Sequence, residues 1–372
     1  MNKEISNIKG ALWDRIAVTI IVMFFGGFAI LTWFKPVSDM SVEERRKLKD
    51  KPSFSVEKIV SGQYMKEFEE YALDQIPLRQ NFREIKALYG TYVLGQLDNN
   101  ELTIFEGHII NMEHTLDENS LEYAANRFNT IYDKYLSDKN INVYMSIIPD
   151  KNYFNGRDYT LKYDYEYLVE KMCNDVENQT YIDIFSLLDL EDYYRTDPHL
   201  RQENIVDVAA KLAESMGTSI STDYEQVQVT KEFYGTYYGQ MALPVKGEEM
   251  SYLTNDIVSN CTVYDYENNR DIDMYNLDAV SGNDPYEMYL YGPLSLITIT
   301  NPKADNEKEL IIFRDSFASS VAPMLATAYN KVTLVDIRYV SPEYLGNFIE
   351  FNEQDVLFLY STSVLNNSET IK

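Results

Sequence analysis

A serine at a strand-to-helix turn is the first feature of this sequence that suits chemistry. Residues Glu309–Ala318 read ELIIFRDSFA, and their apolar run Leu310–Phe313 is typical of a buried parallel strand. After Ser316 the apolar residues follow helical spacing, so we expect a helix to begin at or just after the serine. A hydroxyl at such a turn is exposed where the helix N-terminus can stabilise an oxyanion. Serine is also a common helix N-cap, so the turn alone fits either role.

A serine nucleophile needs a base, and the chain has three histidines: His108, His114 and His199. His199 follows Asp197 by two residues in the segment YYRTDPHL. An Asp-x-His pair on a loop lets the carboxylate fix the imidazole tautomer while the ring reaches a serine. The other two histidines lie in polar, turn-like segments without such a pattern. We therefore expect Asp197, His199 and Ser316 to act together.

The strands and helices that must position these residues alternate along the second part of the chain, from residue 119 to 372. Parallel strands are expected at 141–148, 180–185, 310–313, 331–337 and 355–360, with helices between them. Residues 219–300 show no helical period and are rich in Tyr, Thr and Val, which predicts an inserted β-rich segment. The fold class is therefore α/β, with a parallel sheet, flanking helices and a β-rich insertion.

The amino-terminal part begins with a stretch that is long and apolar enough to cross a membrane. Ile16–Phe34 carries no charge over 19 residues, and at roughly 1.5 Å per residue it spans a hydrocarbon core of about 30 Å. Residues 1–15 are then a cytoplasmic tail, and residues 35–118 are a linker and a helical segment. Basic residues after the span argue for a domain inside, but large domains are translocated largely regardless of charge. We expect a single-pass protein of the cell membrane with its catalytic domain outside the cytoplasm.

Composition excludes several other classes of function. The net charge of −26 leaves no basic face to neutralise phosphates, so nucleic acid is not an expected partner. No C-x-x-C or H-E-x-x-H spacing occurs, and we expect neither a metal nor another cofactor. The two cysteines, Cys173 and Cys261, lie far apart in the sequence, and whether they pair is left open.

Most of the chain resembles the DHHW proteins of bacteria and, more distantly, the alginate O-acetylation proteins AlgX and AlgJ, which are of the SGNH-hydrolase type. Besides the amino-terminal apolar span, the matching segments are Asp74–Arg79 (DQIPLR), Ile148–Lys151 (IPDK), Tyr194–His199 (YRTDPH), Phe233–Tyr237 (FYGTY) and Arg314–Phe317 (RDSF). The resemblance implies an SGNH-like fold with Ser316 as nucleophile, His199 as base and Asp197 as its orienting residue. Two departures stand out: Pro198 and Leu200 replace the second and fourth residues of Asp-His-His-Trp, and Arg314 replaces the glycine of the usual G-D-S.

The resemblance also implies an activity, the O-acylation of a secreted or cell-surface polysaccharide. Its expected partners are the polysaccharide acceptor and a membrane-bound acyltransferase that supplies the acyl group. Two alternatives remain open: an extracytoplasmic carbohydrate esterase with the same residues, and a non-catalytic glycan-binding assembly protein. The further candidates for substrate binding or the oxyanion site are Lys151, Asn152, Arg338, Tyr234 and Tyr237.

The uncharged span gives a prediction about topology. Protease added to intact protoplasts should digest the carboxyl-terminal domain, because the short amino-terminal tail stays in the cytoplasm. An immunoblot against the carboxyl terminus measures the digestion. Protection of the domain until the cells are lysed would reverse the orientation.

Overall fold

The computed structural model describes residues 2–157 and 161–372. The chain forms two compact units, which divide between Leu94 and Gly95. Residues 95–118, which the sequence analysis grouped with the amino-terminal segment, thus lie in the second unit. They do so because the hairpin that they form is hydrogen-bonded there: Asn99 Nδ2 donates to the Met241 carbonyl (2.7 Å), and the Ile109 N–H donates to the Arg195 carbonyl (2.7 Å).

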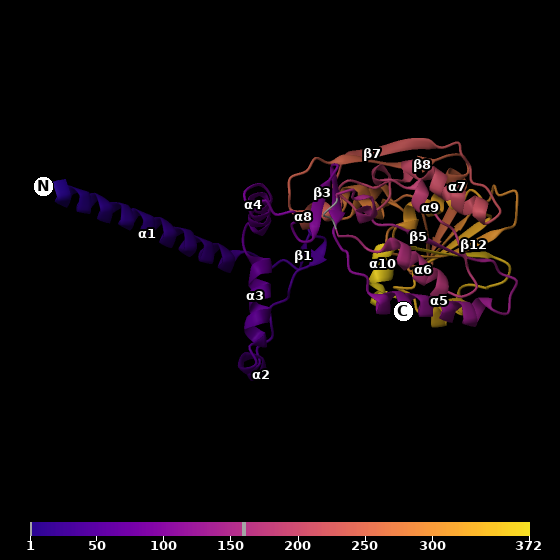
Figure 1. Cartoon of the computed structure of the whole chain (residues 1–372), viewed down its shortest axis with the longest axis horizontal. Coiled ribbons are helices and arrows are strands. Elements are labelled where there is room, and N and C mark those ends of the chain that lie inside the picture. Colours follow the sequence, from indigo (N-terminus) through magenta and orange to yellow (C-terminus); the bar gives the residue numbers. More distant parts are fainter. Residues whose placement is uncertain (1, 158–160) are drawn as a thin grey trace. The chain divides into compact units, whose positions relative to one another are not determined.

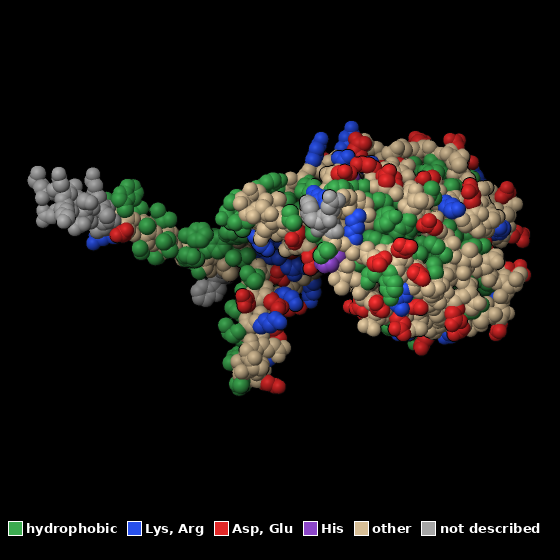
Figure 2. All heavy atoms as spheres, viewed as in Figure 1, with side chains coloured by type: hydrophobic (Ala, Val, Ile, Leu, Met, Phe, Trp, Pro, Cys, Tyr) green, Lys and Arg blue, Asp and Glu red, His purple; other side chains and the backbone are tan. Residues whose placement is uncertain are grey.

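The first unit contains one long helix and several short elements. Helix α1 spans Asn2–Phe34, and within it Leu12–Thr32 is long and apolar enough to cross a membrane, although a signal sequence meets the same criterion. Apolar side chains cover this described stretch of α1 in Figure 2. The other elements are β1 (Met40–Ser41), β2 (Arg46–Lys47), α2 (Val56–Val60), α3 (Gln63–Gln75) and α4 (Arg79–Tyr92). In the DQIPLR segment, Asp74 accepts two hydrogen bonds from the Arg46 guanidinium, so this motif holds the unit together.

The second unit is built on an eight-stranded sheet in the order β10-β9-β11-β13-β12-β14-β5-β6 (Figure 1). Its parallel strands are β5 (Val143–Ile148), β6 (Thr180–Tyr181), β12 (Glu309–Arg314), β13 (Lys331–Val335) and β14 (Asp355–Ser361). These are the five strands that the sequence predicted. The α/β fold class is therefore confirmed.

Helices cover both faces of this sheet. Helices α5 (Glu118–Ile131) and α6 (Tyr165–Asp175) pack on one face, and α7 (Val206–Ser215) and α9 (Ala318–Leu325) pack on the other (Figure 1). Two shorter helices are α8 (Thr236–Met241) and α10 (Thr362–Asn366). The helix expected around Pro342–Phe348 is instead a 3₁₀-helix, η9 (Pro342–Asn347). It connects β13 to β14 along the chain and buries Pro342 and Leu345.

The segment 219–300 is β-rich, as expected, but it is divided between two sheets and also contains helices. Strands β7 (Glu225–Phe233) and β8 (Glu248–Thr254) form a separate antiparallel pair. Strands β9 (Thr262–Asp265), β10 (Arg270–Ile272) and β11 (Leu296–Thr300) extend the main sheet beyond β13. Helix α8 was not predicted, because its six residues are too few to show a period.

The remaining elements are short. Strands β3 (Leu102–Phe105) and β4 (His108–Asn111) form a hairpin, and the left-handed φ of Gly107 (+84°) fits its tight turn. A π-helix, η1 (Tyr132–Leu136), continues α5. The other 3₁₀-helices are η2 (Lys151–Phe154), η3 (Phe185–Leu187), η4 (Leu190–Asp192), η5 (Gln202–Asn204), η6 (Val258–Asn260), η7 (Leu277–Ser281), η8 (Pro285–Met288) and η10 (Ser368–Thr370). The Asp197/His199 loop lies between η4 and η5.

Candidate active site

Ser316 lies in the turn between β12 and α9, at the carboxyl end of the parallel strands. The buried Asp315 carboxylate fixes this turn: Oδ1 accepts from the Phe317 N–H (2.9 Å), and Oδ2 accepts from the N–H and the hydroxyl of Ser361 (both 2.7 Å). Ser361 ends the neighbouring strand β14, so the carboxylate joins two strand ends. Ser316 itself remains partly exposed. The turn therefore presents the hydroxyl at the sheet edge.

The structure brings together the three residues that the sequence singled out. His199 Nε2 lies 2.8 Å from Ser316 Oγ, and His199 Nδ1 lies 2.5 Å from Asp197 Oδ1. The Asp197 side chain is fully buried, whereas the His199 side chain is 13% exposed. With the proton on Nδ1 donated to the carboxylate, Nε2 is the acceptor for the serine hydroxyl. This arrangement can deprotonate Ser316 and stabilise the imidazolium that results.

The loop that carries Asp197 and His199 is held by backbone hydrogen bonds to a buried carboxylate. Glu248, at the start of β8, accepts from the N–H groups of Arg195 and Thr196 (2.9 Å each) and from the Thr196 hydroxyl (3.0 Å). Within the loop the Tyr194 N–H donates to the His199 carbonyl (3.0 Å). The N–H groups thus have partners, as burial requires. No sequence motif pointed to Glu248.

The FYGTY segment supports Asp197 directly. The Thr236 N–H donates to Asp197 Oδ2 (2.8 Å), and the Gly235 N–H donates to the Thr196 hydroxyl (2.9 Å). A Cβ atom on Gly235 would lie only 2.2 Å from Asp197 Cβ, so this approach requires glycine. Two tyrosines of this segment, Tyr234 and Tyr237, are candidates for substrate binding from the sequence. In the structure its glycine and backbone hold the carboxylate that orients the base.

Lys151 lies beneath the same loop. Its buried ammonium donates to the carbonyls of Tyr194 (2.9 Å) and Arg195 (3.4 Å), and it lies 5.0 Å from the centre of the Tyr237 ring. Burial lowers the pKa of Lys151 to about 7, against the opposing attraction of the Asp197 and Glu248 carboxylates. Lys151 therefore contacts the loop from behind and makes no contact with Ser316.

Two aromatic rings hold the imidazole of His199. Tyr286 in η8 is stacked on it, with ring centroids 3.9 Å apart and planes at 8°, and Phe317 contacts it at 4.8 Å. The Tyr286 hydroxyl donates to Ser320 Oγ (3.2 Å), which ties η8 to α9. A stacked electron-rich ring also favours the positive imidazolium. Sequence reasoning missed Tyr286, because nothing distinguishes it among 31 tyrosines.

Arg314, which stands where the usual motif has glycine, is fully buried and anchors the segment after η8. Its guanidinium donates to the carbonyls of Gly292 and Leu294 (3.3 Å each) and to Ser319 Oγ (2.9 Å). Burial lowers its pKa. Arg314 thereby connects the serine turn to the segment that places Tyr286 over His199.

The other predicted binding residues have partners outside the set Asp197, His199 and Ser316. The Asn152 side-chain amide is buried and donates to the carbonyls of Glu113 and Leu161, so its donors are already used. Arg338 forms an ion pair with Asp336 (2.6 Å); burial opposes its charge, but the bond and charge of Asp336 raise its pKa. Tyr234 is 37% exposed and packs on Tyr238, while Tyr237 is partly buried over Lys151. Among the described residues, no group of three or more His, Cys, Asp or Glu side chains is arranged to hold a metal ion.

Comparisons with known proteins show what this fold is similar to. No family model matches the chain, and no curated protein matches it significantly. A DHHW family protein from Eubacterium siraeum DSM 15702 aligns with a TM-score of 0.59 and 17% identity, over 74% of this chain and 95% of that one. Bacillus cereus PatB1 aligns with a TM-score of 0.59 and 19% identity, over 73% of this chain and 98% of that one. A second PatB1 structure carries a sulfonyl adduct. The resemblance to DHHW proteins is thus confirmed at the level of the fold.

The close approach at Gly235 gives a prediction. Gly235→Ala should destabilise the protein by about 1–3 kcal/mol and reduce ester turnover at least tenfold, because the new methyl group displaces the Asp197 loop. Denaturant unfolding and hydrolysis of a chromogenic acetate measure the two effects. Gly156→Ala is the matched control, since its Cβ would meet only Phe105 Cζ at 3.8 Å. Equal behaviour of the two variants would show that the contact does not position the loop.

Burial of Lys151 gives a prediction about pH. Between pH 7 and 9 the folded lysine, with its pKa of about 7, is largely neutral, while the unfolded lysine keeps its proton. At this residue the unfolded state binds more protons, so Lys151 contributes a rise in stability with pH across this window, of at most about 1.4 kcal/mol per pH unit. The buried neighbour His108 does not interfere, because burial lowers its pKa to about 4.

Lys151→Met should remove this rise, although it also removes two hydrogen bonds to the loop. Lys134→Met is a matched control on an exposed lysine whose amine donates to the Glu343 carbonyl. The measurement is the free energy of unfolding in urea at pH 7, 8 and 9. A slope unchanged in Lys151→Met would contradict the pKa assigned to the buried amine.

Proposed function

We propose that this protein is a serine O-acyltransferase that modifies a secreted or cell-surface polysaccharide through an acyl-Ser316 intermediate. The observation that carries the proposal is the continuous chain of contacts from Asp197 Oδ1 to His199 and from His199 Nε2 to Ser316 Oγ. The similarity of fold to the DHHW protein and to PatB1, and the motifs shared with that family, support it. A sulfonyl adduct on PatB1 is the kind of product that an activated nucleophile forms.

The mechanism has two half-reactions. In the first, His199 Nε2 takes the Ser316 proton while Oγ attacks the acyl carbonyl; the donor's leaving group then departs with that proton. In the second, a sugar hydroxyl gives its proton to His199 and attacks the acyl-serine, and Ser316 Oγ regains a proton as it leaves. Asp197 stabilises the imidazolium in both steps. We assign the backbone N–H of Ser316, at the start of the turn into α9, to the oxyanion site.

An esterase would use the same residues, with water in place of the sugar hydroxyl. The motif resemblance favours transfer, with a membrane-bound acyltransferase as the source of the acyl group. Helix α1, if it is retained in a membrane, keeps the domain near such a partner. The assembled Asp197–His199–Ser316 set, with its serine accessible to solvent, argues against a scaffold that has lost its chemistry.

Substitution of the triad tests whether its members act as a unit. Ser316→Ala and His199→Ala should each lower turnover of a chromogenic acetate about 10³-fold or more, and the double variant should be little worse than either. Asp197→Ala should retain more activity, because the base itself remains. Steady-state kinetics and circular dichroism of the four variants provide the measurement. Activity kept by Ser316→Ala would remove the serine from the role of nucleophile.

The second half-reaction separates transfer from hydrolysis. A bound sugar hydroxyl can outcompete water because good orientation is equivalent to an effective concentration of about 10⁵ M or more. Adding β-linked oligosaccharides to the full chain should therefore speed deacylation and yield an acetylated sugar, detected by mass spectrometry. Heat-denatured protein is the control for spontaneous transfer. Free acetate alone, without dependence on any acceptor, would assign the protein to the esterases.

A further inference from the structure

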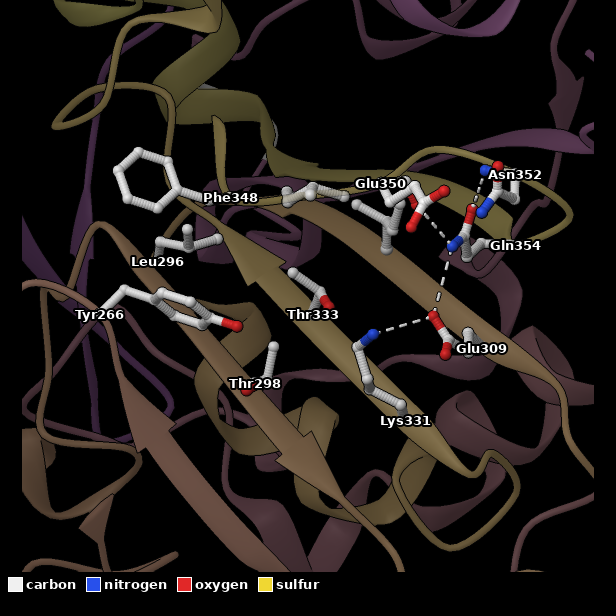
Figure 3. Close-up of a pocket in the computed structure, with 12 residues that line it drawn as sticks. Tyr266, Leu296, Thr298, Glu309, Lys331, Thr333, Phe348, Glu350, Asn352 and Gln354 are labelled. Atoms are coloured by element: carbon white, nitrogen blue, oxygen red, sulfur yellow. Dashed lines mark hydrogen bonds and ion pairs between the residues drawn. The ribbon is translucent and has the colours of Figure 1, made fainter. Parts of the chain in front are cut away.

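A hollow lies on the face of the main sheet that α5 and α6 cover. It occupies about 120 Å³ over strands β11, β13 and β12, near the short helix η9. Glu309 and Lys331, the first residues of β12 and β13, form one side of it, and Tyr266 and Phe348 form the other (Figure 3). The residues of β12 that line the hollow, Glu309 and Ile311, alternate with Leu310 and Ile312, which pack in the cluster that contains Phe317 and α9. The hollow therefore lies on the face of the sheet opposite to α9, the helix that follows Ser316.

The floor of the hollow carries hydroxyl groups that lack partners. Thr298 and Thr333 lie directly opposite each other on β11 and β13, and only 8% and 4% of their respective surfaces are exposed. Neither threonine hydroxyl, nor the hydroxyl of Tyr266, bonds to any residue that the structure describes. Figure 3 shows these three side chains lining the hollow. Because these hydroxyls have no protein partner in the described part of the chain and open onto the hollow, they can bond to a polar ligand there.

The walls of the hollow differ in character. The rings of Tyr266 and Phe348 lie 6.1 Å apart at 77° and offer an apolar surface. On the opposite side Glu309 Oε2 accepts from Lys331 (3.1 Å) and from the Gln354 amide (3.3 Å), as Figure 3 shows. The hollow thus has aromatic rings on one side, charged and amide groups on the other, and hydroxyl groups at its base. These groups suit a molecule that has an apolar face and hydroxyl groups around its edge. A hexose ring has this chemistry.

The charge around the hollow narrows the class of sugar. An adjoining hollow shares Glu309 and Gln354 and adds Lys139, Glu307 and Glu353. The two hollows together are lined by four glutamates, Glu307, Glu309, Glu350 and Glu353, and by two lysines, Lys139 and Lys331. Their combined net charge is −2. A polymer of sugar acids would be repelled from such a surface, whereas neutral or amino-bearing sugars would not.

We propose that these adjoining hollows form a glycan-binding site, separate from the catalytic centre and selective for neutral or amino-bearing hexose units. The site does not depend on the proposed acyl transfer. It provides a second point at which the protein holds a polymer whose other units extend beyond it.

Calorimetric titration of the full chain tests this site. The protein is kept in a detergent without a sugar headgroup, so that the detergent does not occupy the hollow. The Ser316→Ala variant serves as background, so that no turnover adds heat. The three probes are pentamers of N-acetylglucosamine, glucosamine and mannuronate. We expect saturable binding of the first two pentamers and at least tenfold weaker binding of the third.

Substitutions in the hollow show where the binding occurs. Tyr266→Phe and Thr333→Val remove a hydroxyl and keep the shape, so each should weaken binding roughly three- to tenfold. Phe348→Ala should weaken it at least as much, and Thr130→Val on the exposed surface of α5 should change nothing. Tyr266→Phe alone, in a chain that keeps Ser316, should hydrolyse an ester at the same rate as the unaltered protein. Full-strength binding in the hollow variants, equal binding of mannuronate, or the absence of binding by all three pentamers would overturn the proposal.

Discussion

The candidate site depends on the pairing of the buried polar groups in one short loop, Tyr194–His199. A buried backbone group without a partner costs about 1–3 kcal/mol, so a loop of this kind persists only if other elements supply partners. Four parts of the structure supply these partners. They are Lys151 behind the loop, Glu248 from β8, Ile109 from β4, and the Gly235–Thr236 backbone at the start of α8. The position of Asp197 is a consequence of these bonds. Because Asp197 contacts His199, the 2.8 Å approach of His199 Nε2 to Ser316 Oγ depends on these bonds as well.

A second set of contacts fixes the serine relative to that loop. Asp315 ties the turn to the end of β14, and Arg314 ties it to the segment that carries Tyr286. Gln202, just after the loop, donates to the Ser320 carbonyl in α9 (2.8 Å) and so bridges the two halves of the site. The β-rich insertion therefore contributes to the candidate site through Glu248, which binds the loop, and Tyr286, which stacks on His199. Its contribution is the rigidity of the site.

Much of this arrangement could be predicted from the sequence. The five parallel strands were visible as apolar runs, and Asp197, His199 and Ser316 were visible because few residues in this chain could form such a set. The residues that hold this set in place could not be predicted from the sequence. Glu248 and Tyr286 come from distant segments with no periodic pattern, and their roles arise only from the tertiary fold. Gly235 could have been noticed in FYGTY, but a glycine signals a close approach without naming its partner. The hollow over β11 and β13 could not be predicted for a related reason. The sequence predicted a helix between β13 and β14, where the structure has the short η9.

The central claim is that His199 activates Ser316 as a nucleophile, and covalent labelling tests it most directly. The full chain is treated with a phenylmethanesulfonyl fluoride, and the modified residue is located by peptide mass spectrometry in the wild type and in His199→Ala. This account predicts one sulfonyl group per chain, on Ser316, formed at least a hundredfold more slowly without the histidine. Labelling of a different residue, or an equal rate in His199→Ala, would contradict it.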